Sequence, residues 1–158
     1  MRKPKILVNL KSYQRKWQIK PSAMRQFSQK VWDCIGRAGI KQNKESEVTF
    51  VFLNSEQMKR YNKQYRGKDN TTDVLSFPVR EQDEENKEYL GDILICIDKA
   101  SENAKAAKQS LDKELQILTL HGILHLTGFD HETDQGQMDK LESKLRKKVL
   151  DSTILVRN

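Results

Sequence analysis

The chain of 158 residues is long enough for one domain with a sizeable hydrophobic core. Hydrophobic residues make up 36% of it and charged residues 32%, and apolar residues recur periodically almost throughout, which excludes a disordered chain. No apolar run approaches the roughly 20 residues that a membrane helix needs, and the run near the start is too short for a signal peptide, so the sequence predicts a cytoplasmic protein with no membrane partner.

Charge is divided unevenly along the chain. Residues 1–68 hold 17 Lys or Arg and 4 Asp or Glu, a net charge of +13, whereas residues 69–158 hold 12 and 18, a net charge of −6. A basic half of this strength favours a polyanionic partner, because binding to phosphates releases their counterions. A basic surface that only keeps the protein soluble is the alternative that composition leaves open.

The first half of the chain predicts alternating strands and helices. Strands are expected over residues 5–10 and 47–53, and helices over residues 21–38 and from Asn54 through Tyr65. Asn54 and Gln57 have the spacing of a capping box, which marks the start of the second helix. Met58, Tyr61 and Tyr65 share one face of that helix. Their spacing predicts a buried stripe first, although aromatic rings beside the cations Lys63, Arg66 and Lys68 would also suit stacking on bases.

The second half begins with strands and ends in helices. Strands are expected over residues 73–79 and 90–97, and helices after Asp98, over residues 111–127 and over residues 134–150. Pro78 predicts an edge or an end of its strand. Asp98 and Ser110 are predicted helix caps, and Gly128 is expected to end the helix over 111–127 in a left-handed conformation.

All three histidines of the chain lie between residues 121 and 131. His121 and His125 occupy positions i and i+4 of the predicted helix, so both side chains project from one face, and a turn at Gly128 can bring His131 to the same ion. Three imidazoles leave the fourth tetrahedral position for water, as in catalytic zinc sites; copper, nickel and cobalt are also compatible. A single histidine on an apolar face is more often a core residue, but three at this spacing predict a metal site.

The spacing is that of the zinc peptidase pattern with one change. Gly122 stands where such a peptidase carries its catalytic glutamate, which counts against proteolysis, because that carboxylate must accept a proton from water. Asp130, beside a predicted ligand, and Glu114, two turns before His121, are candidates for a general base or for orienting an imidazole. Either residue would serve equally as a solvated or capping carboxylate.

The segment from His121 to His131 resembles the metal motif of the YbeY family of bacterial ribosomal RNA maturation endoribonucleases. Further agreement lies in Tyr65-Arg66-Gly67-Lys68-Asp69 and Thr72-Asp73-Val74-Leu75-Ser76-Phe77-Pro78, which resemble its second signature, and in Gly91-Asp92-Ile93 with Cys96, which resemble its third. Together these segments span residues 61–131 in family order. Agreement is poorest at Thr71, where family members often carry proline, and this affects the stiffness of the loop and leaves the metal site unchanged.

The resemblance implies one α+β domain over residues 1–158, with a small mixed sheet, helices packed on it and a zincin-like helix that carries the metal histidines. It implies a zinc-dependent endoribonuclease specific for single-stranded RNA. The expected substrate is 16S ribosomal RNA near its 3′ end, with a part in ribosome quality control and with the small ribosomal subunit and its assembly factors as partners. Arg66 matches the functional arginine of the family. A guanidinium can hold a phosphodiester by two hydrogen bonds and offset the negative charge that develops at phosphorus.

Two other functions remain open at the level of the sequence. One is a non-catalytic ribosome assembly factor in which zinc is structural, which would bind RNA but cleave none and would unfold when the metal is removed. The other is a metal-dependent hydrolase of a peptide or small molecule, which the peptidase-like spacing favours and which Gly122 and the basic half oppose.

Overall fold

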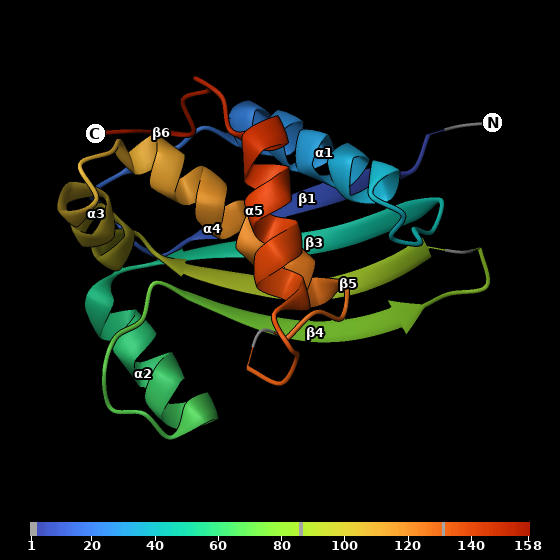
Figure 1. The fold of residues 1–158 in the computed structure, drawn as a ribbon. Coiled ribbons are helices and arrows are strands. Elements are labelled where there is room, and N and C mark those ends of the chain that lie inside the picture. Colours follow the sequence, from blue (N-terminus) through green and yellow to red (C-terminus); the bar gives the residue numbers. More distant parts are fainter. Residues whose placement is uncertain (1–2, 86, 131) are drawn as a thin grey trace.

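Four strands form a mixed sheet that carries helices on both faces (Figure 1). The computed structural model describes residues 3–85, 87–130 and 132–158. The sheet consists of β1 (Lys5–Ser12), β3 (Glu45–Leu53), β4 (Val74–Gln82) and β5 (Lys87–Cys96), and a separate two-stranded sheet pairs β2 (Gln18–Ile19) with β6 (Val156–Arg157). The helices are α1 (Pro21–Arg37), α2 (Ser55–Arg66), α3 (Ile97–Ala106), α4 (Leu111–Leu126) and α5 (Gln137–Val149).

The strand order in the main sheet is β1-β3-β5-β4. Strands β1, β3 and β5 run parallel, and β4 runs antiparallel to β5 at the edge. The central strands β3 and β5 are the most apolar, as expected for strands buried on both faces. Pro78 therefore lies on an edge strand, as the sequence predicted. The predicted α+β fold with a small mixed sheet is confirmed.

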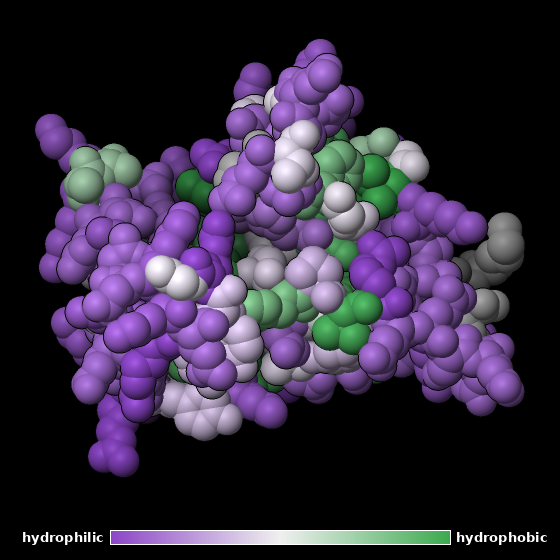
Figure 2. All heavy atoms as spheres, turned by 90° about the horizontal axis from the view of Figure 1, so that it is seen from below, coloured by the Kyte–Doolittle hydropathy of each residue, from purple (hydrophilic) through white to green (hydrophobic). Residues whose placement is uncertain are grey.

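The two faces of the sheet are covered unequally. Phe50, Ile93 and other fully buried residues of one face pack in the main core beneath α1, α4 and α5. On the opposite face α2 covers only one end, where Met58 packs with Leu75 and Leu94 in a second, smaller cluster. Seen from below the view of Figure 1, where β4 and α2 lie, most of the surface is hydrophilic, and apolar residues gather near its centre (Figure 2). The site described below opens at the edge strand β4, between these two layers.

Local signals position the ends of most helices. Asn54 and Gln57 form the predicted capping box at the start of α2, the Ser110 side chain accepts from Lys113 N at the start of α4, and Gly128 follows α4 with φ +108°. The prediction for Asp98 is wrong. This residue lies in the first turn of α3, and its carboxylate accepts instead from the backbone N–H of Ser55, at the start of α2.

Helix α5 begins at Gln137, three residues after the predicted start. Asp134 is the reason for the error, because its carboxylate accepts from the backbone N–H of Gly136 and of Met138 and so caps the helix from outside it. No helix in the described parts of the chain is both long and apolar enough to span a membrane.

Strand β4 bulges where it passes the end of α4. Its pairing with β5 shifts register between Pro78 and Glu81, and Arg80 within the bulge has φ +57°. Gly91 lies opposite, with φ +143°, and a side chain there would collide with the carbonyl oxygen of Phe77. The glycine of the third sequence motif is thus required by the close approach of two strands.

Candidate functional site

His121 and His125 lie one turn apart on α4 and face the same side, as predicted. Their ring centroids are 4.8 Å apart and their planes are inclined by 71°. Both side chains are partly exposed, which keeps them within reach of a ligand. The third predicted ligand, His131, lies outside the described residues. Within the described residues no group of three metal-binding side chains comes together.

Glu142 of α5 holds the ring of His121. The distance between His121 Nδ1 and Glu142 Oε1 is 2.7 Å, and Arg146 donates to the other carboxylate oxygen at 3.0 Å. Burial alone raises the pKa of Glu142, but its hydrogen bonds with His121 and Arg146 and the positive charge of Arg146 outweigh it and hold this pKa below its ordinary value. The ionised carboxylate therefore fixes the tautomer in which Nδ1 carries the proton, and Nε2 becomes the nitrogen whose lone pair a metal ion binds.

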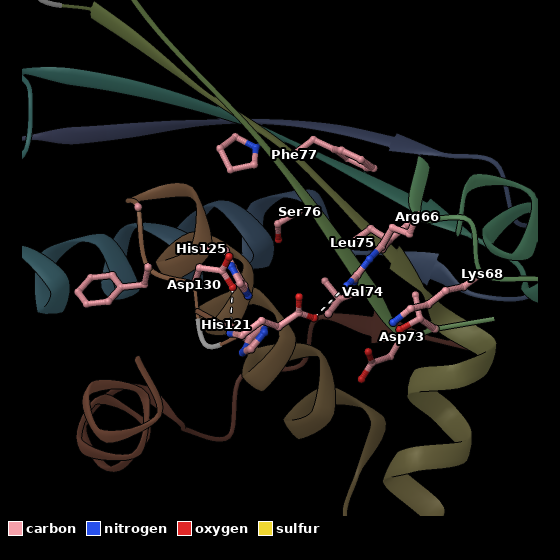
Figure 3. Close-up of a pocket in the computed structure, with 15 residues that line it drawn as sticks. Arg66, Lys68, Asp73, Val74, Leu75, Ser76, Phe77, His121, His125 and Asp130 are labelled. Atoms are coloured by element: carbon pink, nitrogen blue, oxygen red, sulfur yellow. Dashed lines mark hydrogen bonds and ion pairs between the residues drawn. The ribbon is translucent and has the colours of Figure 1, made fainter. Parts of the chain in front are cut away.

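A cavity of about 660 Å³ opens beside this imidazole pair. Figure 3 shows His121, His125 and Asp130 on one side of it and Arg66 and Lys68 on the other. Strand β4 lies between them and supplies Val74, Leu75, Ser76, Phe77 and Pro78 to the lining. The structure thus brings the predicted functional arginine to the same cavity as two predicted metal ligands.

Arg66 is the last residue of α2, and its side chain is 38% exposed. Its guanidinium forms an ion pair of 2.9 Å with Glu132, from the segment that follows α4. The chain beyond Arg66 is tied back to α2, because the Asn62 side chain donates to Asn70 and the Thr71 hydroxyl donates to the Ser55 carbonyl. Thr71 thus supplies a hydrogen bond that holds this loop against α2.

The two candidate carboxylates occupy different environments. Asp130 lines the cavity, and its Oδ1 accepts from the backbone N–H of Glu132. Glu114 is 8% exposed and is absent from the described cavity lining, and its Oε2 accepts from Gln109 Nε2 at 2.7 Å. Burial raises the pKa of Glu114 above its ordinary value. Of the two, only Asp130 is placed beside the imidazoles.

Gly122 packs against the sheet. A methyl group at this position would lie 2.9 Å from Cδ1 and from Cγ2 of Ile93 on β5, closer than carbon atoms pack. The helix that carries the histidines therefore lies so near the sheet that any side chain at position 122 would have to displace Ile93, which agrees with the expectation from the sequence that this is not a peptidase site of the glutamate type.

Two residues that support the site were missed from the sequence. Glu142 could have been found, because it interrupts the apolar stripe of Met138, Leu145 and Val149 on a helix whose buried positions are otherwise apolar. Arg80 could not. It reaches the end of α4 through the bulge in β4, pairs with the buried Glu88 and donates to the Leu126 carbonyl at 3.0 Å.

The described residues fit a divalent transition metal. Imidazole nitrogen is a ligand that zinc and its neighbours accept, and a carboxylate on the opposite ring nitrogen is the usual support for such a ligand. His121 has this support from Glu142, and His125 is placed to act on the same side of the helix.

Comparisons with known proteins agree on one family. The sequence matches the family described as endoribonuclease YbeY over residues 9–150. The endoribonuclease YbeY of Koribacter versatilis is 46% identical over 121 residues, which cover 76% of this chain and 74% of that protein. The corresponding protein of Nautilia profundicola is 42% identical over 115 residues, with 72% and 81% covered. The solution structure of a Thermotoga maritima protein matches 90% of this chain and 89% of its own, with a TM-score of 0.58 and 26% identity.

Proposed function

This chain belongs to the endoribonuclease YbeY family, and we propose on that ground that it cleaves single-stranded RNA with the help of a bound metal ion. The observation that carries the proposal is the arrangement of the cavity, in which Arg66 faces the pair His121 and His125 across β4. The same cavity is thus lined by a guanidinium that can bind a phosphodiester and by two imidazoles that can bind a metal ion.

We assign His121, His125 and His131 to one zinc ion, which makes α4 a zincin-like metal helix. When bound, such an ion supplies Lewis acidity toward a phosphate oxygen or a water molecule. Glu142 orients His121 for this role from behind, through the hydrogen bond to Nδ1.

The other roles belong to side chains of the opposite wall and the cavity rim. Arg66 holds the phosphodiester through paired N–H donors and stabilises the negative charge that develops during cleavage. Of the carboxylates that line the cavity, Asp130 lies on the side of the imidazole pair (Figure 3), and we give it the role of accepting a proton or orienting a group that carries one. Lys68 adds positive charge on the side where Arg66 lies.

The substrate follows from charge and from the family. Residues 1–68 carry a net charge of +13 and would guide a polyanion to the cavity, so the affinity for RNA should fall steeply as the salt concentration rises. We extend the proposal to ribosomal RNA, with 16S RNA near its 3′ end as the substrate and the small ribosomal subunit with its assembly factors as the partner, in the cytoplasm. All of residues 1–158 are taken to act as one domain.

The test is cleavage of a labelled single-stranded RNA by protein that is stripped of metal and then reconstituted with zinc. Wild-type protein should lose cleavage on stripping and regain it on reconstitution, and His121→Ala and Arg66→Ala should abolish it. Arg25→Ala is the matched control, because Arg25 is an exposed arginine on α1, outside the cavity lining.

Cleavage that survives in His121→Ala or Arg66→Ala would point to a contaminating nuclease and contradict the proposal. Salt-sensitive RNA binding without any cleavage, together with unfolding on metal removal, would favour the non-catalytic assembly factor instead.

A further inference from the structure

Tyr65 is a large aromatic side chain that remains 56% exposed. The buried stripe expected from the helical spacing holds for Met58, which is fully buried, but not for Tyr65. The ring of Tyr65 stacks on Tyr61, with centroids 6.0 Å apart and planes inclined by 14°, and forms an edge-to-face contact with Phe77, with centroids 5.3 Å apart. Its position is thus fixed by two neighbouring rings while much of its surface stays open.

A second hollow continues from this ring cluster. It has a volume of about 340 Å³ and lies between Tyr61 and Tyr13, with Arg60 in its lining. Tyr13 is 57% exposed and follows β1, and Gln57 of α2 donates to its carbonyl oxygen at 3.0 Å, which ties the two segments together. Two of the large exposed hydrophobic side chains of the protein therefore border the same side of α2.

We define the aromatic strip as Tyr13, Tyr61, Tyr65 and Phe77. The strip joins the catalytic cavity directly, because Phe77 lines that cavity and also contacts Tyr65. Tyr65 precedes Arg66, whose guanidinium reaches into the cavity. The exposed cations beside the strip are Arg60, which lines the second hollow, and Arg66 and Lys68, which line the cavity.

We propose that the aromatic strip is a binding site for unpaired nucleobases, so that RNA leaving the cavity crosses the edge strand β4 and continues along α2. This inference rests on the proposed function. Base faces stack on aromatic rings without regard to sequence, while flanking cations follow the phosphates. Bases of a duplex are already stacked on one another and cannot stack on the strip. The strip should therefore bind single-stranded RNA in preference to a duplex.

Charge decides against an ordinary protein partner at this surface. An apolar groove for a neutral peptide does not need cations along its border, whereas Arg60, Arg66 and Lys68 beside the aromatic rings match the alternating bases and phosphates of a single strand. An acidic polypeptide shares the negative charge but lacks regularly spaced flat bases, so it serves as the competing ligand in the test.

The test compares Tyr65→Leu with Tyr65→Phe in equilibrium binding of a labelled, unstructured RNA that spans the cavity and the strip. Tyr65→Leu keeps apolar bulk against Phe77 but removes the flat ring, and its affinity should fall about tenfold, within the range that loss of one stacked base gives. Tyr65→Phe keeps the ring and should bind as the wild type does. An RNA with one abasic position under the strip should lose the same affinity with wild-type protein and lose little more with Tyr65→Leu.

Ile154→Ala is the matched control, because Ile154 is a 53% exposed apolar residue that lines neither hollow. If wild-type protein cleaves RNA while Tyr65→Leu binds it with unchanged affinity, the proposal that the aromatic strip binds nucleobases is wrong and the proposed function stands. If wild-type protein neither binds nor cleaves RNA, both fall. Binding of polyglutamate that equals RNA binding and depends equally on Tyr65 would also overturn the assignment to nucleobases.

Discussion

Glu142 on α5 accepts a hydrogen bond of 2.7 Å from Nδ1 of His121 on α4, and so connects the packing of two helices to the chemistry of one ring. Glu142 is 7% exposed and is held from its other oxygen by Arg146. The last helix of the chain therefore contributes to a site whose proposed ligands all precede it.

Glu142→Gln should weaken zinc binding about tenfold or more while the fold persists. The amide is a poorer acceptor than the carboxylate, so it stabilises the required tautomer of His121 less and lowers the basicity of that ligand. Zinc affinity is measured by competition with a chromophoric chelator. Glu102→Gln is the control, because Glu102 is an exposed glutamate of α3. Equal zinc affinity in Glu142→Gln and wild type would contradict the orienting role.

Gly122→Ala should destabilise the protein by roughly 1–3 kcal/mol, the usual cost of overpacking a core. Alanine is the better helix former by about 1 kcal/mol, but the added methyl group forces Ile93 to move. The free energy of unfolding is measured with urea. The loss should be smaller in an Ile93→Val background, where part of the obstructing side chain is removed.

Gly36→Ala provides the matched control for that measurement. Gly36 is a glycine within α1, and its added methyl group meets the far end of the Gln42 side chain, which can move aside with loss of its hydrogen bond to the Trp32 carbonyl. Gly122→Ala that is as stable as Gly36→Ala would show that α4 can withdraw from the sheet, and would remove the steric argument against a glutamate at position 122.

The sequence predicted those parts of the site that depend on local spacing. The pair His121 and His125 follows from helical periodicity, and the end of α4 follows from the left-handed conformation at Gly128. The position of His131 remains a prediction, since this residue lies outside the described parts of the chain.

Features that depend on tertiary contacts were missed or mistaken. Asp98 has the residue type of a helix cap but lies near the start of α2, and the backbone N–H of Ser55 binds its carboxylate instead. Arg80 reaches Leu126 only because a bulge in β4 aims it there, and no local pattern reveals a register shift between two strands. Tyr65 has the spacing of a buried stripe, but it lies in the last turn of α2. That turn extends beyond the part of the sheet that the helix covers, so the ring stays exposed.

Glu132→Gln should strengthen RNA binding at low salt by about two- to fivefold, the range of a single exposed charge interaction. The carboxylate of Glu132 forms an ion pair with Arg66 and so competes with a phosphate for the guanidinium. Affinity for single-stranded RNA is measured at rising salt, and the gain should shrink as screening increases. Glu56→Gln serves as the control, since Glu56 is an exposed glutamate in the first turn of α2. Weaker binding in Glu132→Gln would assign Glu132 to support of the site rather than to competition.

Glu114→Gln should make the protein at least as stable as wild type at pH 7. Burial raises the pKa of Glu114, and Asp73 adds to the rise, while the hydrogen bond from Gln109 and the charge of Arg146 oppose it. The folded state therefore binds a proton more tightly than the unfolded state. Protonated Glu114 therefore contributes to the stability of the folded state below the ordinary pKa of a glutamate, and this contribution is lost as pH rises through the raised pKa.

Urea unfolding of both proteins between pH 4 and pH 8 measures the difference, because other titrating groups contribute equally to each. The gain of Glu114→Gln over wild type should grow as pH rises through that window and then stay constant. Cleavage should be retained, since Asp130 rather than Glu114 lines the cavity. Loss of cleavage in a stable Glu114→Gln protein would instead give Glu114 the role proposed for Asp130.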